Sequence, residues 1–119
     1  MTTIKFENLT KHHINVIRSD GGVDSIPPSG REARVYSEQD RMSTFNGYDV
    51  VQTRWGTVAG VPDPSEGTIY ITSSLVAMAL PERQDIVTPN THPRAVVRDN
   101  DGNVQAVKSF QCFWKGETA

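Results

Sequence analysis

The sequence predicts a small, mainly β domain, a β-rich α+β fold built as a compact antiparallel sandwich or barrel-like sheet with one short helix. Short β-branched runs are interrupted by turn residues about every eight to twelve positions, a spacing typical of sandwiches and barrels. A single alanine-rich segment breaks this pattern and predicts the helix. The chain has 119 residues, close to the usual size of one domain, and no repeat or linker divides it. We therefore expect a single domain over residues 1–119.

Each predicted strand is a run of β-branched or aromatic residues bounded by glycine, proline or asparagine. In the first run Ile4 and Phe6 share one face, because side chains alternate along a strand. The sequence Asp20-Gly21-Gly22 predicts a hairpin turn between the second and third runs. The expected strands cover residues 3–9, 13–18, 23–26, 33–36, 49–55, 68–71, 85–88, 95–98 and 103–110.

The middle of the chain is expected to hold more turns than strands. Residues 37–44 form a polar stretch that the sequence does not assign to a strand. Asn46 and Gly47 follow it and favour a tight turn, because both tolerate positive φ. Residues 56–60 are interpreted as a short return after the next strand, and residues 61–67 as a loop rich in proline.

The helix is predicted around residues 74–81. Four β-forming residues precede it, and Ser73 or Ser74 is a natural N-cap at the change from strand to helix. Leu75, Met78 and Ala79 share one helical face, and Pro81 limits how far the helix continues. This is the only helical signal in an otherwise extended chain.

Composition and charge exclude several classes of protein. Hydrophobic residues make up 36% and charged residues 22%, which suits a water-soluble globule. No apolar run approaches the roughly 18 residues that a membrane helix needs, and the N-terminus lacks a signal-peptide core. The net charge of −2 argues against nucleic-acid binding, which needs a basic face. We therefore expect a cytoplasmic protein with no membrane or nucleic-acid partner.

The single cysteine, Cys112, fits a reducing compartment because it cannot form an internal disulfide. Its neighbours Phe110, Phe113 and Trp114 indicate a buried, inert thiol. No Gly-x-Ser-x-Gly elbow, phosphate loop or dinucleotide fingerprint is present. The chain is therefore predicted not to be an enzyme and to need no cofactor.

Metal binding has little support in the spacing of possible ligands. His12 and His13 are adjacent, so on a strand they point to opposite faces. His92 lies far away along the chain between two prolines, and no tetrahedral ligand signature is present. We therefore predict no metal site.

One constellation of polar residues favours a ligand site. The change from strand to helix offers hydroxyls and unpaired backbone amides together, which suit an anion such as the phosphate of a nucleotide. The nearby loop is dense in hydrogen-bonding groups and stiffened by two prolines. The same residues are equally typical of helix caps and turns, so a purely structural role stays open. The candidate residues are Thr72, Ser73, Ser74, Thr88, Asn90, Thr91 and Arg94.

The aromatic and arginine residues allow a second kind of site. Arginines outnumber lysines eight to four, and the guanidinium suits protein interfaces better than an ammonium does. We expect most of the tyrosines and tryptophans in the core or at its edge; if two of them are exposed beside arginines, they become interface anchors. The aromatic residues concerned are Tyr36, Tyr48, Trp55, Tyr70 and Trp114.

Several short motifs in a fixed order resemble a family of small uncharacterised proteins of bacteria and of phages or prophages. They are Asn8-Leu9-Thr10-x-His12, Pro27-Pro28-Ser29-Gly30 with Ala33-Arg34-Val35, Gly56-x-Val58-x-Gly60-Val61-Pro62, Gly67-Thr68-Ile69-Tyr70-Ile71-x-Ser73-x-Leu75-Val76-Ala77, and Asp85-x-Val87-x-Pro89-x-Thr91-x-Pro93. The resemblance covers about residues 7 to 110. The chain departs from the family at Lys11, Asn90 and His92, where proline, aspartate and glycine are usual. The resemblance implies a mobile-element protein without enzymatic activity.

Two classes of function follow. The first is a phage-encoded binding protein that acts by protein–protein contact, for example by inhibiting a host factor or an antiviral defence system. The second is a small-ligand binder that sequesters a nucleotide-type signal near Ser73. A structural or accessory protein of a phage particle, working as a homo-oligomer, is a further alternative.

Overall fold

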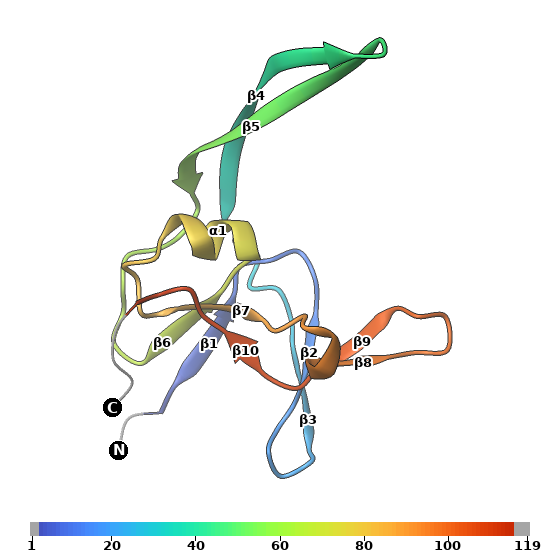
Figure 1. Cartoon of the computed structure of the whole chain (residues 1–119). Helices are drawn as coiled ribbons and strands as arrows, with labels where there is room; N and C mark the ends of the chain where they lie inside the picture. The colour runs from blue at the N-terminus through green and yellow to red at the C-terminus, as the bar shows by residue number, and fades with distance from the viewer. Residues whose placement is uncertain (1–2, 116–119) are drawn as a thin grey trace.

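A computed structural model describes residues 3–115 and confirms the predicted class, mainly β with one short helix (Figure 1). The strands of the body are short, whereas two long strands form a separate hairpin. The elements are β1 (Lys5–Asn8), β2 (Ile14–Ile17), β3 (Val23–Ile26), β4 (Arg34–Phe45), β5 (Tyr48–Ala59), β6 (Thr68–Ile71), α1 (Ser74–Ala79), β7 (Ile86–Pro89), a 3-10 turn (Pro93–Ala95), β8 (Val96–Arg98), β9 (Val104–Val107) and β10 (Phe110–Gln111).

The body of the molecule consists of two four-stranded sheets. The first has the order β1-β6-β7-β10 and the second the order β3-β2-β9-β8. Strand β6 contributes buried side chains to two hydrophobic clusters, because successive side chains point to opposite sides of a strand. Tyr70 packs in a cluster with Leu9, Val76 and Ile86, whereas Ile71 packs in another with Ile14 and Val107. One central strand therefore supplies two separate hydrophobic cores.

The pairing of the strands is mixed, where the sequence predicts an antiparallel sandwich or barrel. β1 and β6, β6 and β7, and β2 and β9 are parallel pairs. The described part of the chain forms no closed barrel. Alternation of side chains along a strand shows which face is buried but not which strand lies beside it. The sequence pattern therefore does not decide whether neighbouring strands are parallel or antiparallel.

Helix α1 begins where the sequence predicts. The Ser73 side chain accepts a hydrogen bond from the amide of Val76, which makes Ser73 the N-cap. The helix is shorter than predicted and ends at Ala79. Its buried residues are Val76 and Ala77, whereas Leu75 and Met78, on the predicted common face, are about half exposed. α1 contacts β7 on one side and the start of the long hairpin on the other.

The hairpin β4–β5, which we call the arm, projects from the body and pairs with no other strand among residues 3–115 (Figure 1). The predicted Asn46-Gly47 turn is confirmed, with φ of 52° and 82°. The polar residues 37–44 are a strand, and residues 56–59 continue β5, so the predicted short return is wrong. A ladder to a long partner strand holds such a polar segment extended without any buried face.

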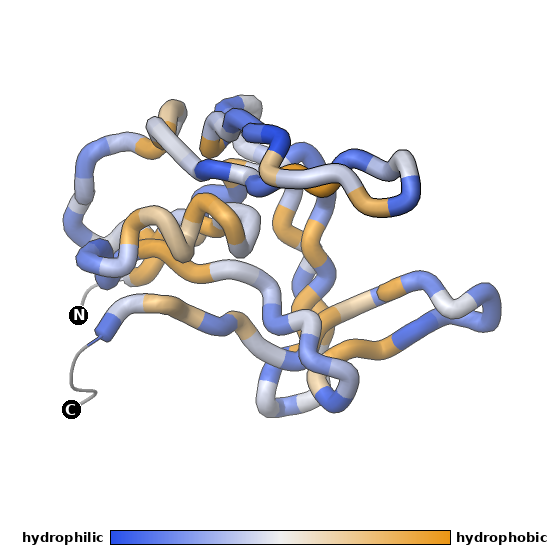
Figure 2. The backbone as a smooth tube through the Cα atoms, turned by 45° about the horizontal axis from the view of Figure 1, so that its top comes forward, coloured by the Kyte–Doolittle hydropathy of each residue, from blue (hydrophilic) through white to orange (hydrophobic). Residues whose placement is uncertain are grey.

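The arm makes the molecule elongated. The radius of gyration is 17.0 Å and the extents are 58 × 39 × 31 Å. A compact chain of this length would have a radius of about 13.5 Å. In Figure 2 hydrophobic residues gather in α1 and the strands beside it, while along the arm they are interspersed with hydrophilic ones.

The C-terminal segment contains two further corrections. The predicted strand 103–110 breaks after Val107, and β10 then joins the other sheet through β7. Cys112 is exposed, so the predicted buried thiol is wrong. Phe113 packs against the first core cluster, and because neighbouring residues in an extended chain point opposite ways, Cys112 faces outward.

Candidate functional site

The turn after β1 is held by Asn8, whose side chain is almost fully buried. Its Nδ2 donates to the carbonyl oxygens of His12 (2.8 Å) and Ile26 (3.0 Å). Its Oδ1 accepts from the amide and hydroxyl of Thr10, at 2.9 and 2.6 Å. Asn8 and Thr10 therefore satisfy polar groups of the local backbone, a role typical of such residues in turns. These bonds fix residues 10–12 as one rim of a groove.

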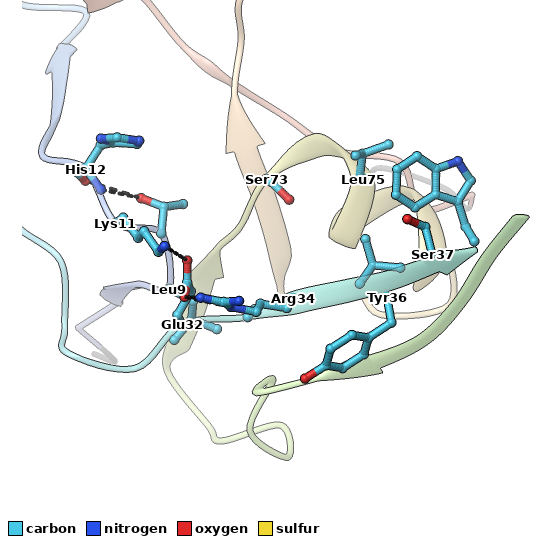
Figure 3. Close-up of a pocket in the computed structure, with 13 residues that line it drawn as sticks. Leu9, Lys11, His12, Glu32, Arg34, Tyr36, Ser37, Ser73 and Leu75 are labelled. Carbon is cyan, nitrogen blue, oxygen red and sulfur yellow. Dashed lines mark hydrogen bonds and ion pairs between the residues drawn. The ribbon is translucent and has the colours of Figure 1, made fainter. Parts of the chain in front are cut away.

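We call this hollow the base groove, because it lies where the arm leaves the body (Figure 3). Its volume is about 600 Å³, within the range of sites that hold a small molecule or a few side chains of a partner. The turn after β1, the first residues of β4, Trp55 of β5 and the start of α1 form its walls. The lining residues are Leu9, Thr10, Lys11, His12, Glu32, Ala33, Arg34, Val35, Tyr36, Ser37, Trp55, Ser73 and Leu75.

Charged residues of both signs lie at one end of the base groove, and Leu75 lies at the other (Figure 3). Glu32 is 3.7 Å from Lys11 Nζ and 2.7 Å from Arg34 Nη2. The hydrogen bond from Arg34 holds the pKa of Glu32 below its ordinary value, so the carboxylate stays ionised. This end of the groove therefore presents one carboxylate paired with two cations.

Tyr36 and Trp55 carry the aromatic part of the site. Their exposed fractions are 57% and 52%, so the expectation that they lie in the core is wrong. Tyr48 is also exposed, whereas Tyr70 is buried and Trp114 is half-buried. Tyr36 and Trp55 also line a second hollow of about 440 Å³ together with Arg54, continuous with the base groove along the arm. Tyr36 and Trp55 are therefore two exposed aromatic residues that line hollows with Arg34 and Arg54, the arrangement that we expect of interface anchors from the sequence.

Most of the predicted ligand-site residues do come together. Thr72, Ser73, Ser74, Thr88 and Thr91 line one hollow of about 300 Å³, with Thr10, His12, Ile14 and Pro89. Asn90 and Arg94 do not line it. Asn90 donates instead to the Ser109 hydroxyl (3.0 Å), and Arg94 is an exposed residue of the 3-10 turn.

The polar groups of this hollow are largely used within the fold. The Thr72 hydroxyl is buried and donates to the Ser73 carbonyl at 2.9 Å. The Ser73 hydroxyl caps α1, and Thr88 is buried in β7. The structural role that the sequence left open for these residues is therefore observed, although the hollow itself also exists.

Two residues that shape these hollows are not marked as site residues by sequence reasoning. His12 lines both the base groove and the smaller hollow, and Leu75 lines the base groove. Their neighbours come from distant segments, so no local motif marks them. The one available signal was the pairing of exposed aromatic residues with arginines.

Within residues 3–115 no group of three or more histidines, cysteines, aspartates or glutamates could hold a metal ion. The helices in that part of the chain are all too short or too polar to cross a membrane. Comparison with protein-family models, with curated proteins and with solved structures finds no match for this chain.

Proposed function

We propose that this protein is a non-enzymatic binding protein that contacts a partner protein through the base groove and the adjoining part of the arm. The observation that carries the proposal is the exposure of Tyr36 and Trp55 beside Arg34 and Arg54. Tryptophan, tyrosine and arginine are the residues most enriched where binding energy concentrates in protein interfaces.

The surroundings of the two aromatic side chains support this proposal. They stand on a hairpin whose backbone is already paired, so binding requires less ordering than it would on a loop. Charges of both signs at Lys11, Glu32 and Arg34 suit a mixed polar rim around an apolar centre. A protein surface offers such a combination, whereas a nucleic acid would need a positive face.

The resemblance to small phage and prophage proteins suggests the context. A phage-encoded protein in the host cytoplasm that blocks a host factor or an antiviral defence system would need only a complementary surface and no catalytic group. A structural or accessory role in a phage particle is the alternative within the same class. An assembly with the symmetry of a tail or capsid would favour that alternative.

The test is capture of a partner from host lysate by the tagged chain and by the double variant Tyr36→Ser, Trp55→Ser. Loss of one anchor of about 2 kcal/mol should weaken binding about 30-fold, and loss of both should weaken it by roughly 700-fold. Val23→Ser, which changes an exposed apolar residue of β3, is the matched control and should keep the partner. A partner retained equally by the double variant, or no partner at all, would refute the proposal.

A second candidate, binding of a nucleotide-type ligand, has one observation in its favour. Five predicted residues, which include Ser73 and Thr91, line the same hollow. A nucleotide at a hundredfold excess over its Kd would add about 2.7 kcal/mol to stability. Thermal denaturation with mono-, di- and cyclic nucleotides should then show a shift of several degrees that Thr91→Val reduces. Unchanged melting temperatures throughout would remove this candidate.

A further inference from the structure

The arm lacks the partners that normally stabilise a sheet. It has only two strands, and a two-stranded hairpin is marginally stable in water unless a third strand or another layer covers it. Large apolar side chains along it are strongly exposed: Tyr48 by 75%, Phe45 by 63% and Met42 by 60%. Monomeric proteins rarely leave so extended an apolar surface open.

Both faces of the arm carry these side chains. Phe45 and Tyr48 are opposite each other in the ladder, so they share a face, and Val50 follows two residues later on the same face. Val51 and Trp55 lie on the other face. A strand added at an edge would cover neither face, but it would supply the third strand that a two-stranded hairpin lacks. The number of strands therefore favours pairing at an edge.

The two edges of the arm differ in charge. β4 carries Glu38, Asp40 and Arg41 in its middle, which is how natural sheets protect an edge from association. β5 carries Arg54 as its only charge between Val50 and Val58. Its other residues there are β-branched, aromatic or small, apart from Gln52. The unprotected edge is therefore that of β5.

Charge also indicates the kind of strand that fits. The arm contains three arginines and three acidic residues over residues 34–59, so it has no net charge. The arms of two copies would not repel each other, and neither an anionic nor a cationic partner is preferred. The occupant that these observations favour is a second copy of the same strand.

We infer that β5 pairs antiparallel with β5 of a second copy, on a two-fold axis at Thr53, to form a four-stranded sheet. This register places Val51 opposite Trp55 of the other copy twice on one face and Gln52 opposite Arg54 on the other. Centring the pair on Arg54 would oppose two guanidinium groups. Centring it on Gln52 would set Val50 against Arg54 and Asp49 against Trp55. Of these three registers, only the one centred on Thr53 sets apolar residues opposite apolar residues and polar residues opposite polar residues.

The inference is tested on the purified chain alone, so its outcome is separate from that of partner capture, although Trp55 belongs to both surfaces. Thr53→Cys in a Cys112→Ser background should form a disulfide-linked dimer under mild oxidation, since both copies of residue 53 lie at the axis. Gln39→Cys in the same background is the matched control, because Gln39 pairs with Thr53 across the hairpin but lies on the β4 edge. It should form no disulfide-linked dimer.

Sedimentation of the unmodified chain should give twice the 13.2 kDa mass of one copy. Val51→Lys should restore the single-copy mass, because a charged residue at an edge opposes pairing. Thr44→Lys, on β4, should leave the dimer intact, and circular dichroism would show that both variants keep their sheet content. A monomer at every concentration, equal cross-linking by Gln39→Cys, or a dimer that survives Val51→Lys would overturn the inference.

Discussion

The arm and the body use β structure in opposite ways. In the body, strands of about four residues are held by burial: Tyr70, Ile71 and Ile86 expose 3% or less of their surface. In the arm, strands of twelve residues are held by their ladder to each other, and their side chains are exposed or at most half-buried. The body therefore owes its stability to its own core, whereas the arm depends on the ladder between its two strands.

The largest expected effect separates the two regions directly. Ile71→Ala removes a fully buried side chain that belongs to the second core cluster. It should lower the free energy of unfolding by about 2–5 kcal/mol. Met42→Ala, at an exposed site of the arm, should change it by less than about 0.5 kcal/mol. Chemical denaturation of both variants measures the contrast, and equal losses would mean that the arm has a core of its own.

Asn8→Ala tests whether the rim of the base groove depends on the body. The substitution removes the Asn8 donor from the carbonyl oxygens of His12 and Ile26, leaving His12 with only the longer bond from the Thr10 hydroxyl, and it removes the acceptor of the Thr10 amide. We expect a loss of about 2–3 kcal/mol, because unsatisfied buried groups are costly. Asn8→Asp keeps the acceptor and should recover part of that loss. Full stability of Asn8→Ala would show that the turn is held by other contacts.

The ion pair of Arg83 and Asp85 gives the body a pH dependence. Arg83 donates to both carboxylate oxygens of Asp85 at 2.8 Å, and both side chains are largely buried. The hydrogen bond from Arg83 holds the pKa of Asp85 below its ordinary value. The pair therefore stabilises the fold above the unfolded pKa of about 3.9, and this contribution disappears as pH falls through the lower folded value.

Asp85→Asn should reduce stability at neutral pH by about 1–2 kcal/mol, since hydrogen bonds to charged groups contribute about that much. Its stability should also change less than that of the unmodified chain below about pH 4. Thermal denaturation across this range measures both effects. Parallel pH profiles of the two proteins would contradict the assignment.

The smallest effect is expected in the arm. Arg54 bonds to Glu38 and Asp40 across the hairpin, but all three side chains are about half exposed or more. Water screens such pairs, so Arg54→Ala should cost about 0.2–1 kcal/mol. Urea denaturation at low and high salt measures this loss. A larger, salt-independent loss would indicate that the arm is buried in an assembly.

Much of the body could be predicted from local signals. A serine N-cap at Ser73 or Ser74 is predictable because serines follow four β-formers and precede alanines, and the Asn46-Gly47 turn is predictable because both residues tolerate positive φ. Five of the seven candidate ligand residues line one hollow, whereas Asn90 and Arg94 do not. What failed was anything set by distant neighbours, such as the exposure of Trp55 and Cys112 or the extended state of residues 37–44.

The amino-acid sequence by itself determined the mainly β class, the single helix, the hairpin turns and the hydrogen-bonding role of Asn8, because these depend on backbone preferences and on residues close along the chain. Only the tertiary structure decided the parallel pairing of β1 with β6 and the projection of the arm, and with them the base groove. These features depend on which strands meet across the body. The alternation of side chains along a strand does not identify its neighbours, because the pattern is the same whether the strand packs on a core, on a partner protein or faces water.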